Sequence, residues 1–373
     1  MKAEAVRPAR RTNASLLGGL AFFLAMPALA QPPALPALGL SAEHTATIGV
    51  SSGGYMAEQL AVAWPSRFEA LGLVASGPWG CALGELGVAL GQCMGQRHGT
   101  ADLAAIDRRL QGYREQSRVG DADDLAELRV YLWHGDKDGT IDPAVGHAAV
   151  TQWQGWLADE RQLQAVFHPD AGHGWPTTVE SDIPLADCSE GGPPYLLDCH
   201  TDLAGDFLTW WLGALQPAEP PESAESAEQP ESAEPAEFAS DARLIAFDQR
   251  EFDAKGLADT GFLYLPEACE QQQNTCKLVV AFHGCEMAVD DTDDEAIQPP
   301  AFAKASGLNR YAERLGLVVL YPQAEASLAN PKGCWDWWGF SESTWQQDPL
   351  HDSRDGRQVS ALMSMIDRLQ QRP

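Results

Sequence analysis

Basic residues, long apolar runs and cysteine pairs with metal-binding spacing are all scarce in this 373-residue sequence. Lysine and arginine number 25 against 53 aspartate and glutamate, so the net charge is −28. This surplus argues against nucleic acid and anionic membranes as partners, and we interpret it as a means of solubility rather than a site for a cationic partner. Because C-x-x-C pairs and Cys/His clusters of zinc-finger spacing are absent from the sequence, a structural zinc site is not expected.

The longest apolar run, Leu16 to Met26, is shorter than the roughly 20 residues of a membrane-spanning helix. A basic stretch precedes this run, and an A-x-A pattern ending at Ala30 follows it, as in a secretory signal peptide. We therefore predict a signal peptide over 1–30, cleaved near Ala30, and a protein secreted to the periplasm or the medium. Removing this segment, which has a net charge of +3, leaves a mature chain of charge −31.

Export changes the interpretation of the eight cysteines. An even number of cysteines in an oxidising compartment predicts disulfide bonds rather than metal ligands.

One segment, 216–240, consists almost entirely of Pro, Glu, Ser and Ala, with a glutamate at every third position from Glu219 to Glu237. Its residues cannot bury enough apolar surface to offset the entropy lost on ordering. We predict a disordered acidic linker that separates segment 31–215 from segment 241–373.

Both segments alternate short apolar runs typical of strands with runs of helical spacing. This alternation predicts an α/β fold with a mostly parallel central sheet and helices on both faces. The predicted strands are Thr45–Val50, Phe68–Ala75, Leu128–Trp133, Leu163–Phe167, Arg243–Phe247, Gly261–Leu265, Lys277–Phe282 and Leu317–Tyr321; the predicted helices are Tyr55–Trp64, Ala101–Gln116, Pro143–Leu157, Asp202–Leu215, Ala303–Arg314 and Gln358–Gln370.

The pentapeptide Gly49-Val50-Ser51-Ser52-Gly53 fits the G-x-S-x-G pattern. A strand is predicted before it and a helix after it, which is the context of a nucleophile elbow. The glycines permit the tight turn that exposes Ser51 at a helix N-terminus. We therefore predict that Ser51 is a catalytic nucleophile, although a plain Gly-Ser loop would give the same pattern.

A serine nucleophile needs a base and an orienting carboxylate, and hydrolases present them in the order Ser, Asp, His. The loop after strand Leu128–Trp133 contains Asp136 and Asp138, and Asp142 follows. We favour Asp138 because it lies deeper in the loop, further from the strand end.

The loop after strand Leu163–Phe167 contains His173 between two glycines, which would let its ring approach Ser51. We predict that His173 is the base. The competing histidines His168, His134 and His147 lie nearer a strand end or beside the acid loop, so they are less well placed.

An oxyanion hole requires a backbone N–H after the nucleophile and another from a loop after an earlier strand. Only twenty mature residues precede Ser51, so that earlier strand must come from elsewhere. The strand Lys277–Phe282 and the following His283-Gly284-Cys285 fit it. We therefore predict one circularly permuted α/β-hydrolase, with Ser52 and Cys285 as the two N–H donors.

Several motifs together resemble the circularly permuted, single-domain poly(3-hydroxybutyrate) depolymerase family. They are Gly49-Val50-Ser51-Ser52-Gly53-Gly54-Tyr55-Met56, the Gly135-x-x-Asp138 loop, Tyr264-Leu265-Pro266, His283-Gly284-Cys285, Leu320-Tyr321-Pro322-Gln323 and Gly333-Cys334-Trp335-Asp336-Trp337. The resemblance covers nearly all of the mature chain except the linker.

This resemblance implies an esterase that hydrolyses poly(3-hydroxybutyrate), related polyhydroxyalkanoates or their oligomers through an acyl-enzyme on Ser51. It implies that Ser51, Asp138 and His173 are catalytic, and that no cofactor or metal is needed. We expect Trp335, Trp337 and Tyr55 to bind substrate, and we expect a monomer. The implied disulfides are Cys81–Cys93, Cys188–Cys199, Cys269–Cys276 and Cys285–Cys334.

Two alternatives remain open at this stage. The same triad would serve a feruloyl or acetyl esterase acting on plant-wall carbohydrate. Alternatively, 241–373 could be a separate polymer-binding module tethered to a catalytic segment 31–215.

Overall fold

The computed structural model describes residues 1, 31–213, 243–271, 275–289, 298–342 and 348–373. Within these ranges, Pro32–Pro373 forms one compact unit. The predicted signal peptide and the predicted acidic linker lie outside the described residues, apart from Met1.

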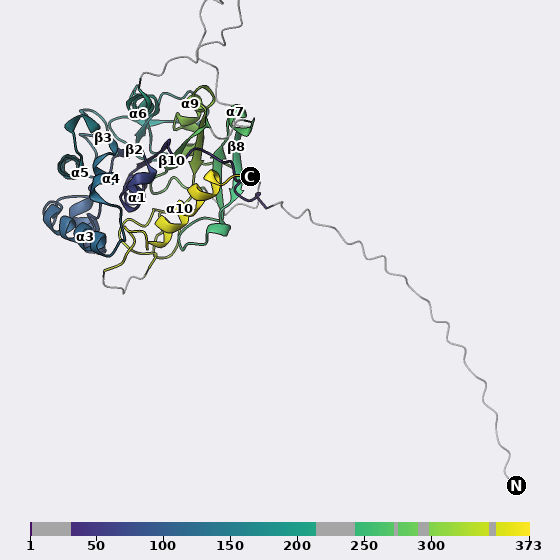
Figure 1. Cartoon of the computed structure of the whole chain (residues 1–373), viewed down its shortest axis with the longest axis horizontal. Helices are drawn as coiled ribbons and strands as arrows, with labels where there is room; N and C mark the ends of the chain where they lie inside the picture. The colour runs from purple at the N-terminus through teal and green to yellow at the C-terminus, as the bar shows by residue number, and fades with distance from the viewer. Residues whose placement is uncertain (2–30, 214–242, 272–274, 290–297, 343–347) are drawn as a thin grey trace, which may run out of the picture. The chain divides into compact units, whose positions relative to one another are not determined.

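The unit is built on an eight-stranded sheet with the order β4-β3-β2-β1-β10-β11-β9-β8 (Figure 1). Neighbouring strands from β4 to β11 run parallel, whereas β9 and β8 at one edge pair antiparallel. The strands span Thr45–Val50 (β1), Ala70–Val74 (β2), Arg129–Gly135 (β3), Leu163–His168 (β4), Leu244–Asp248 (β8), Thr260–Tyr264 (β9), Lys277–Phe282 (β10) and Leu317–Tyr321 (β11).

The first strand in the chain, β1, lies near the middle of this sheet. Its Thr45 is opposite Leu278 of β10, and its Gly49 is opposite Phe282. Strands from both sides of residues 214–242 therefore share one set of backbone hydrogen bonds. The alternative of a separate module over 241–373 does not fit this pairing, because it would require two independent sheets.

Side chains of the central strands alternate between two hydrophobic cores, one on each face of the sheet. In β10, Leu278 and Val280 enter one core, whereas Val279 and Ala281 enter the other. The buried helices cover both faces, which agrees with the predicted α/β class. Figure 1 shows α1 and α10 next to each other, and these two helices are in contact.

The longer helices are α1 (Ser52–Ala63), α3 (Leu103–Glu115), α5 (Pro143–Trp156), α6 (Leu203–Leu212), α9 (Leu308–Leu315) and α10 (Arg357–Gln370), with α4 (Ala122–Ala126), α7 (Glu267–Gln271) and α8 (Ala301–Ala305) shorter.

The predicted helix Ala303–Arg314 is two helices, α8 and α9. Gly307 has a φ of 90°, a left-handed conformation that interrupts the helical hydrogen bonds between them. A small second sheet, of order β5-β7-β6, was not predicted at all. Its strands Trp175–Pro176 (β5), Ala186–Asp187 (β6) and Leu196–Asp198 (β7) are too short to show a period-two pattern.

All eight cysteines form disulfide bonds in the pairs that the family resemblance implied. The bonds are Cys81–Cys93, Cys188–Cys199, Cys269–Cys276 and Cys285–Cys334.

Candidate active site

The predicted nucleophile Ser51 lies at the sharp turn between β1 and α1. Its φ of 57° is positive, a conformation that costs energy for a residue with a side chain. A Cβ added to Gly49 would come within 2.1 Å of the Gly53 carbonyl oxygen, and one on Gly53 within 2.3 Å of the His283 carbonyl oxygen. Only glycine fits at these positions, so the turn itself requires the two glycines of G-x-S-x-G.

Asp138 follows β3, and three hydrogen bonds hold its carboxylate. One oxygen accepts hydrogen bonds from the backbone N–H groups of Thr140 and Ile141, both at 2.8 Å. The other oxygen receives a 2.7 Å hydrogen bond from Nδ1 of His173. The carboxylate is thereby fixed in orientation, and it fixes the imidazole with Nε2 as the free nitrogen.

The two competing aspartates have other positions. The Asp136 side chain is exposed to solvent. Asp142 is the N-cap of α5 and accepts a 2.9 Å hydrogen bond from the backbone N–H of Ala144. Neither is bonded to His173.

The competing histidines are also placed differently from His173. His147 is exposed and stacks on Phe167 with ring centroids 3.9 Å apart. His134 is buried, its Nε2 lies 2.9 Å from the carbonyl oxygen of Ile141, and burial lowers its pKa. The His134 Nε2 also lies 3.5 Å from an Asp138 carboxylate oxygen, so the ring packs against Asp138. Its lowered pKa keeps the ring neutral.

The His173 loop is held by a backbone network that includes the small second sheet. The Gly172 N–H donates to the Cys188 carbonyl at 2.6 Å, and the Trp175 N–H donates to the Tyr195 carbonyl at 2.8 Å. The disulfide Cys188–Cys199 closes the segment that supplies both acceptors. The sequence did not predict these backbone hydrogen bonds. The available signal was the even cysteine count, which indicated disulfide bonds.

The loop that follows β10 lies against the Ser51 turn. A Cβ added to Gly284 would be 3.3 Å from the Ser51 Cβ. His283 anchors this loop, because its Nδ1 donates to the Gly284 carbonyl at 2.7 Å and its Nε2 accepts from the Ala324 N–H at 3.1 Å. Complete burial lowers the pKa of His283 to about 4, so the ring is neutral.

The backbone N–H groups of Ser52 and Cys285 are free to donate. Neither has a hydrogen-bond acceptor among the residues that the structure describes. The two residues are in contact, since Ser52 Oγ lies 3.4 Å from Cys285 Sγ. Ser52 Oγ also accepts a 3.3 Å hydrogen bond from the Trp335 N–H, and the disulfide Cys285–Cys334 joins the same segments.

The three aromatic residues predicted to bind substrate are buried, as are Ser51 and His173 themselves. Trp335 is 0 % exposed, and its Nε1 donates to the His283 carbonyl at 3.0 Å. Trp337 and Tyr55 are 9 % and 4 % exposed and stack with centroids 5.0 Å apart. Large apolar rings pack in cores unless a surface is left open for them. All three side chains therefore make packing contacts, and their predicted contact with substrate stays a prediction.

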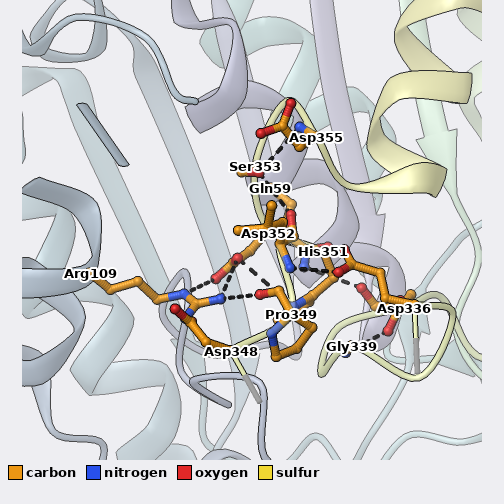
Figure 2. A network of polar contacts seen from close by, with 12 residues as sticks. Gln59, Arg109, Asp336, Gly339, Asp348, Pro349, His351, Asp352, Ser353 and Asp355 are labelled. Atoms are coloured by element: carbon orange, nitrogen blue, oxygen red, sulfur yellow. Dashed lines mark hydrogen bonds and ion pairs between the residues drawn. The ribbon is translucent and has the colours of Figure 1, made fainter. Parts of the chain in front are cut away.

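A polar network outside the predicted site holds the segment after Trp335 (Figure 2). The carboxylate of Asp336 accepts hydrogen bonds from the N–H groups of Gly339, Phe340 and Ser341 at 2.7 to 2.9 Å. This carboxylate thereby folds the chain into a compact turn.

In the same network, Arg109 on α3 makes two hydrogen bonds to Asp352, of 2.8 and 2.9 Å. Figure 2 shows the two side chains pointing toward each other. Burial alone would raise the pKa of Asp352, but the charges of Arg109 and His351 and the hydrogen bonds from Arg109 and Tyr113 together hold the pKa below its usual value. The pair fastens the chain after residue 347 to the helical layer.

No cluster of three or more His, Cys, Asp or Glu side chains in the described ranges has the geometry to hold a metal ion. No helix in those ranges has the length and apolarity to cross a membrane.

No protein-family model matches the chain. The chain is 31 % identical to a poly(3-hydroxybutyrate) depolymerase of Delftia acidovorans over 90 % of its own length and 61 % of that protein. It is 27 % identical to a polyhydroxybutyrate depolymerase of Talaromyces funiculosus over 89 % of its own length and 91 % of that protein. The chain thus spans about three fifths of the first relative and nearly all of the second.

Solved structures give the same result. A PHB depolymerase complexed with an R3HB trimer superposes with a TM-score of 0.74 and 26 % identity, covering 90 % of this chain and 98 % of that one. The crystal structure of PHB depolymerase from Penicillium funiculosum has a TM-score of 0.72 and 25 % identity, with the same coverage. Similarity in sequence and in fold therefore converges on poly(3-hydroxybutyrate) depolymerases over about 90 % of this chain.

Proposed function

We propose that the protein is an exported serine esterase that hydrolyses poly(3-hydroxybutyrate), related polyhydroxyalkanoates or their oligomers. The observation that carries this proposal is the 2.7 Å hydrogen bond between Asp138 and His173. Both residues follow strands parallel to β1, so they lie at the same edge of the sheet as Ser51. This arrangement supports the roles of acid, base and nucleophile.

The proposed reaction begins when His173 Nε2 takes the proton of the Ser51 hydroxyl, whose oxygen attacks the ester carbonyl carbon. Asp138 stabilises the resulting imidazolium. The negative oxygen of the tetrahedral intermediate accepts hydrogen bonds from the N–H groups of Ser52 and Cys285. Collapse of the intermediate expels the alcohol end of the polymer, which takes its proton from His173.

Water then completes the cycle. His173 takes a proton from the water as it attacks the acyl-enzyme, the same two N–H groups hold the oxyanion, and Ser51 is released with its proton restored. The product is the 3-hydroxyacyl acid. None of these steps requires a group other than the chain, the ester and water.

The polyester substrate is proposed from the relatives. One related structure is described as a complex with an R3HB trimer, and both curated relatives are named as depolymerases of this polymer. The four disulfides support export to an oxidising compartment. The monomeric state stays a prediction.

We further propose that 31–215 and 241–373 form one circularly permuted catalytic domain joined by the acidic linker 216–240. The support is the sheet order, in which the first strand of the chain, β1, pairs with β10 rather than lying at an edge. Without the permutation, a strand preceding the nucleophile would supply the oxyanion loop that here follows β10.

The test is Ser51→Ala, assayed side by side on amorphous poly(3-hydroxybutyrate), its soluble trimer, an aryl butyrate ester and a ferulate ester. We expect the wild type to cleave the polymer and trimer, and the variant to lose on the order of 10⁶-fold in kcat. Ser66→Ala, at an exposed serine, is the matched control. Turnover by Ser51→Ala at the control rate would contradict the mechanism, and a preference for ferulate would contradict the substrate.

A further inference from the structure

Two loops of the candidate site are joined by a side-chain hydrogen bond that the proposed reaction does not use. The Tyr195 hydroxyl donates to the Glu286 carboxylate at 2.7 Å. Tyr195 belongs to the segment that supports His173, and Glu286 is the residue after the proposed oxyanion donor Cys285. The bond therefore connects the two halves of the proposed machinery, which come from opposite sides of residues 214–242.

On one side, Tyr195 is in direct contact with the base. Its ring lies edge-to-face with the His173 ring, with centroids 6.1 Å apart and an interplanar angle of 79°. Its carbonyl accepts the 2.8 Å hydrogen bond from the Trp175 N–H. Ring and backbone of Tyr195 thus touch both His173 and the chain two residues beyond it.

On the other side, Glu286 is fixed relative to the oxyanion loop. Its N–H donates to the Lys332 carbonyl at 2.7 Å, and its carboxylate pairs with Lys332 Nζ at 3.2 Å. Cys285 immediately before it is tied to Cys334, two residues after Lys332. A movement of Glu286 would therefore move the Cys285 N–H.

The backbone conformations of Tyr195 and Glu286 indicate that both residues are held in place by their surroundings. Tyr195 and Glu286 have φ values of 61° and 63°, a left-handed conformation that is unfavourable for residues with a side chain. Such conformations persist where the surrounding contacts enforce them, and they concentrate at functional sites. The Glu286 side chain is 39 % exposed, so a purely stabilising ion pair here would contribute little.

We propose that Tyr195 and Glu286 are positioning residues, which couple the placement of the His173 ring to that of the Cys285 N–H through their shared hydrogen bond. Neither exchanges a proton with the substrate. The inference rests on the proposed function, because it assigns a consequence to the geometry of the base and the oxyanion hole.

The experiment is a double-mutant cycle on the full chain with the soluble aryl butyrate ester. Tyr195→Phe removes the hydroxyl and keeps the ring, while Glu286→Ala removes the acceptor. Each single change should lower kcat about fivefold, the order expected for one partly exposed hydrogen bond to a carboxylate. KM and Tm should stay unchanged, and the double variant should lose no more than either single variant.

Two further variants separate positioning from folding. Glu286→Gln keeps an acceptor oxygen and should restore kcat to within twofold of wild type. Tyr311→Phe removes another tyrosine hydroxyl bonded to a carboxylate, that of Asp202 at the start of α6, and should leave kcat unchanged. An unchanged kcat in Tyr195→Phe, additive losses in the double variant, or a loss that follows Tm would each overturn the inference.

The same assay includes Ser51→Ala. If that variant is inactive while Tyr195→Phe equals wild type, only the positioning role fails. If Ser51→Ala is active, the proposed function fails whatever the cycle shows.

Discussion

The candidate site has two sides, the His173 loop and the loop after β10, and they are held by contacts of different range along the sequence. His173 depends on its own part of the chain, through backbone hydrogen bonds to Cys188 and Tyr195 and a disulfide between residues eleven apart. The loop after β10 depends on distant residues, through His283 contacts and a disulfide of separation 49.

Orienting the His173 ring and holding the loop after β10 against the Ser51 turn are therefore separate structural tasks. The acid–base side mainly requires one ring to face one direction, which a short local network achieves. The oxyanion side requires a loop from one segment to remain against a turn of the other, which only long-range contacts achieve. Changes on either side should therefore reduce kcat, and changes on the second should cost more stability than comparable changes on the first.

The sharpest way to isolate orientation is Asp138→Asn. An amide keeps the volume but presents an N–H where the carboxylate accepts, so His173 is no longer held in the tautomer that the reaction needs. We expect kcat to fall on the order of 10⁴-fold with little change in Tm. Asp136→Asn, two residues away on an exposed side chain, should behave as wild type. Equal effects of the two changes would show that Asp138 is not the acid.

The range of the contacts can be tested by removing one disulfide at a time with paired Cys→Ser changes. Closing 49 residues restricts the unfolded chain more than closing eleven. Loss of Cys285–Cys334 should therefore lower the free energy of unfolding by about 4 kcal/mol, and loss of Cys188–Cys199 by about 3 kcal/mol. Denaturant unfolding of both variants gives the comparison.

Both variants should also lower kcat, because Cys285–Cys334 restrains the proposed oxyanion loop and Cys188–Cys199 supports the His173 loop. If the variant without Cys188–Cys199 were less stable than the variant without Cys285–Cys334, the assignment of closure to the oxyanion side would be contradicted.

A further prediction concerns the response of the oxyanion side to acid. His283 has a pKa of about 4 in the folded protein, below the value of about 6.5 in an unfolded chain. Between these values the unfolded state binds a proton that the folded state does not, so stability falls as the pH drops from about 6.5 to about 4. The loss attributable to His283 totals about 3 kcal/mol.

Denaturant unfolding measured across that pH range checks this prediction in wild type and in His283→Asn, in which the slope should be smaller. His147→Asn, at an exposed histidine, is the matched control and should keep the wild-type slope. A slope that His283→Asn leaves intact would assign the acid sensitivity to other groups.

Much of the fold could be predicted because the central strands are short apolar runs between clear breaks. Lys277–Phe282 and Leu317–Tyr321 have the predicted limits, and Thr45–Val50 leads into Ser51 as expected. The Asp138–His173 pairing followed from the chemistry that a serine nucleophile requires. Local pattern and chemical necessity were sufficient for these features.

Other features depend on contacts that no local pattern contains. The break at Gly307 depends on tertiary packing, because an isolated glycine is tolerated within a helix. The burial of Trp335 and Trp337 depends on how the segment after Cys334 folds over α1. The pairing of Arg109 with Asp352 joins residues 243 positions apart. Sequence patterns carry little information about contacts of that range.

The pairing of β1 with β10 has a consequence for the order of events during synthesis. The nucleophile strand is made more than two hundred residues before its partner, so one edge of β1 waits unpaired until Lys277–Phe282 has emerged. Contacts of such sequence separation form late, since a long loop must close first. A chain interrupted before Lys277–Phe282 therefore carries the proposed triad residues without the loop proposed to complete the oxyanion hole.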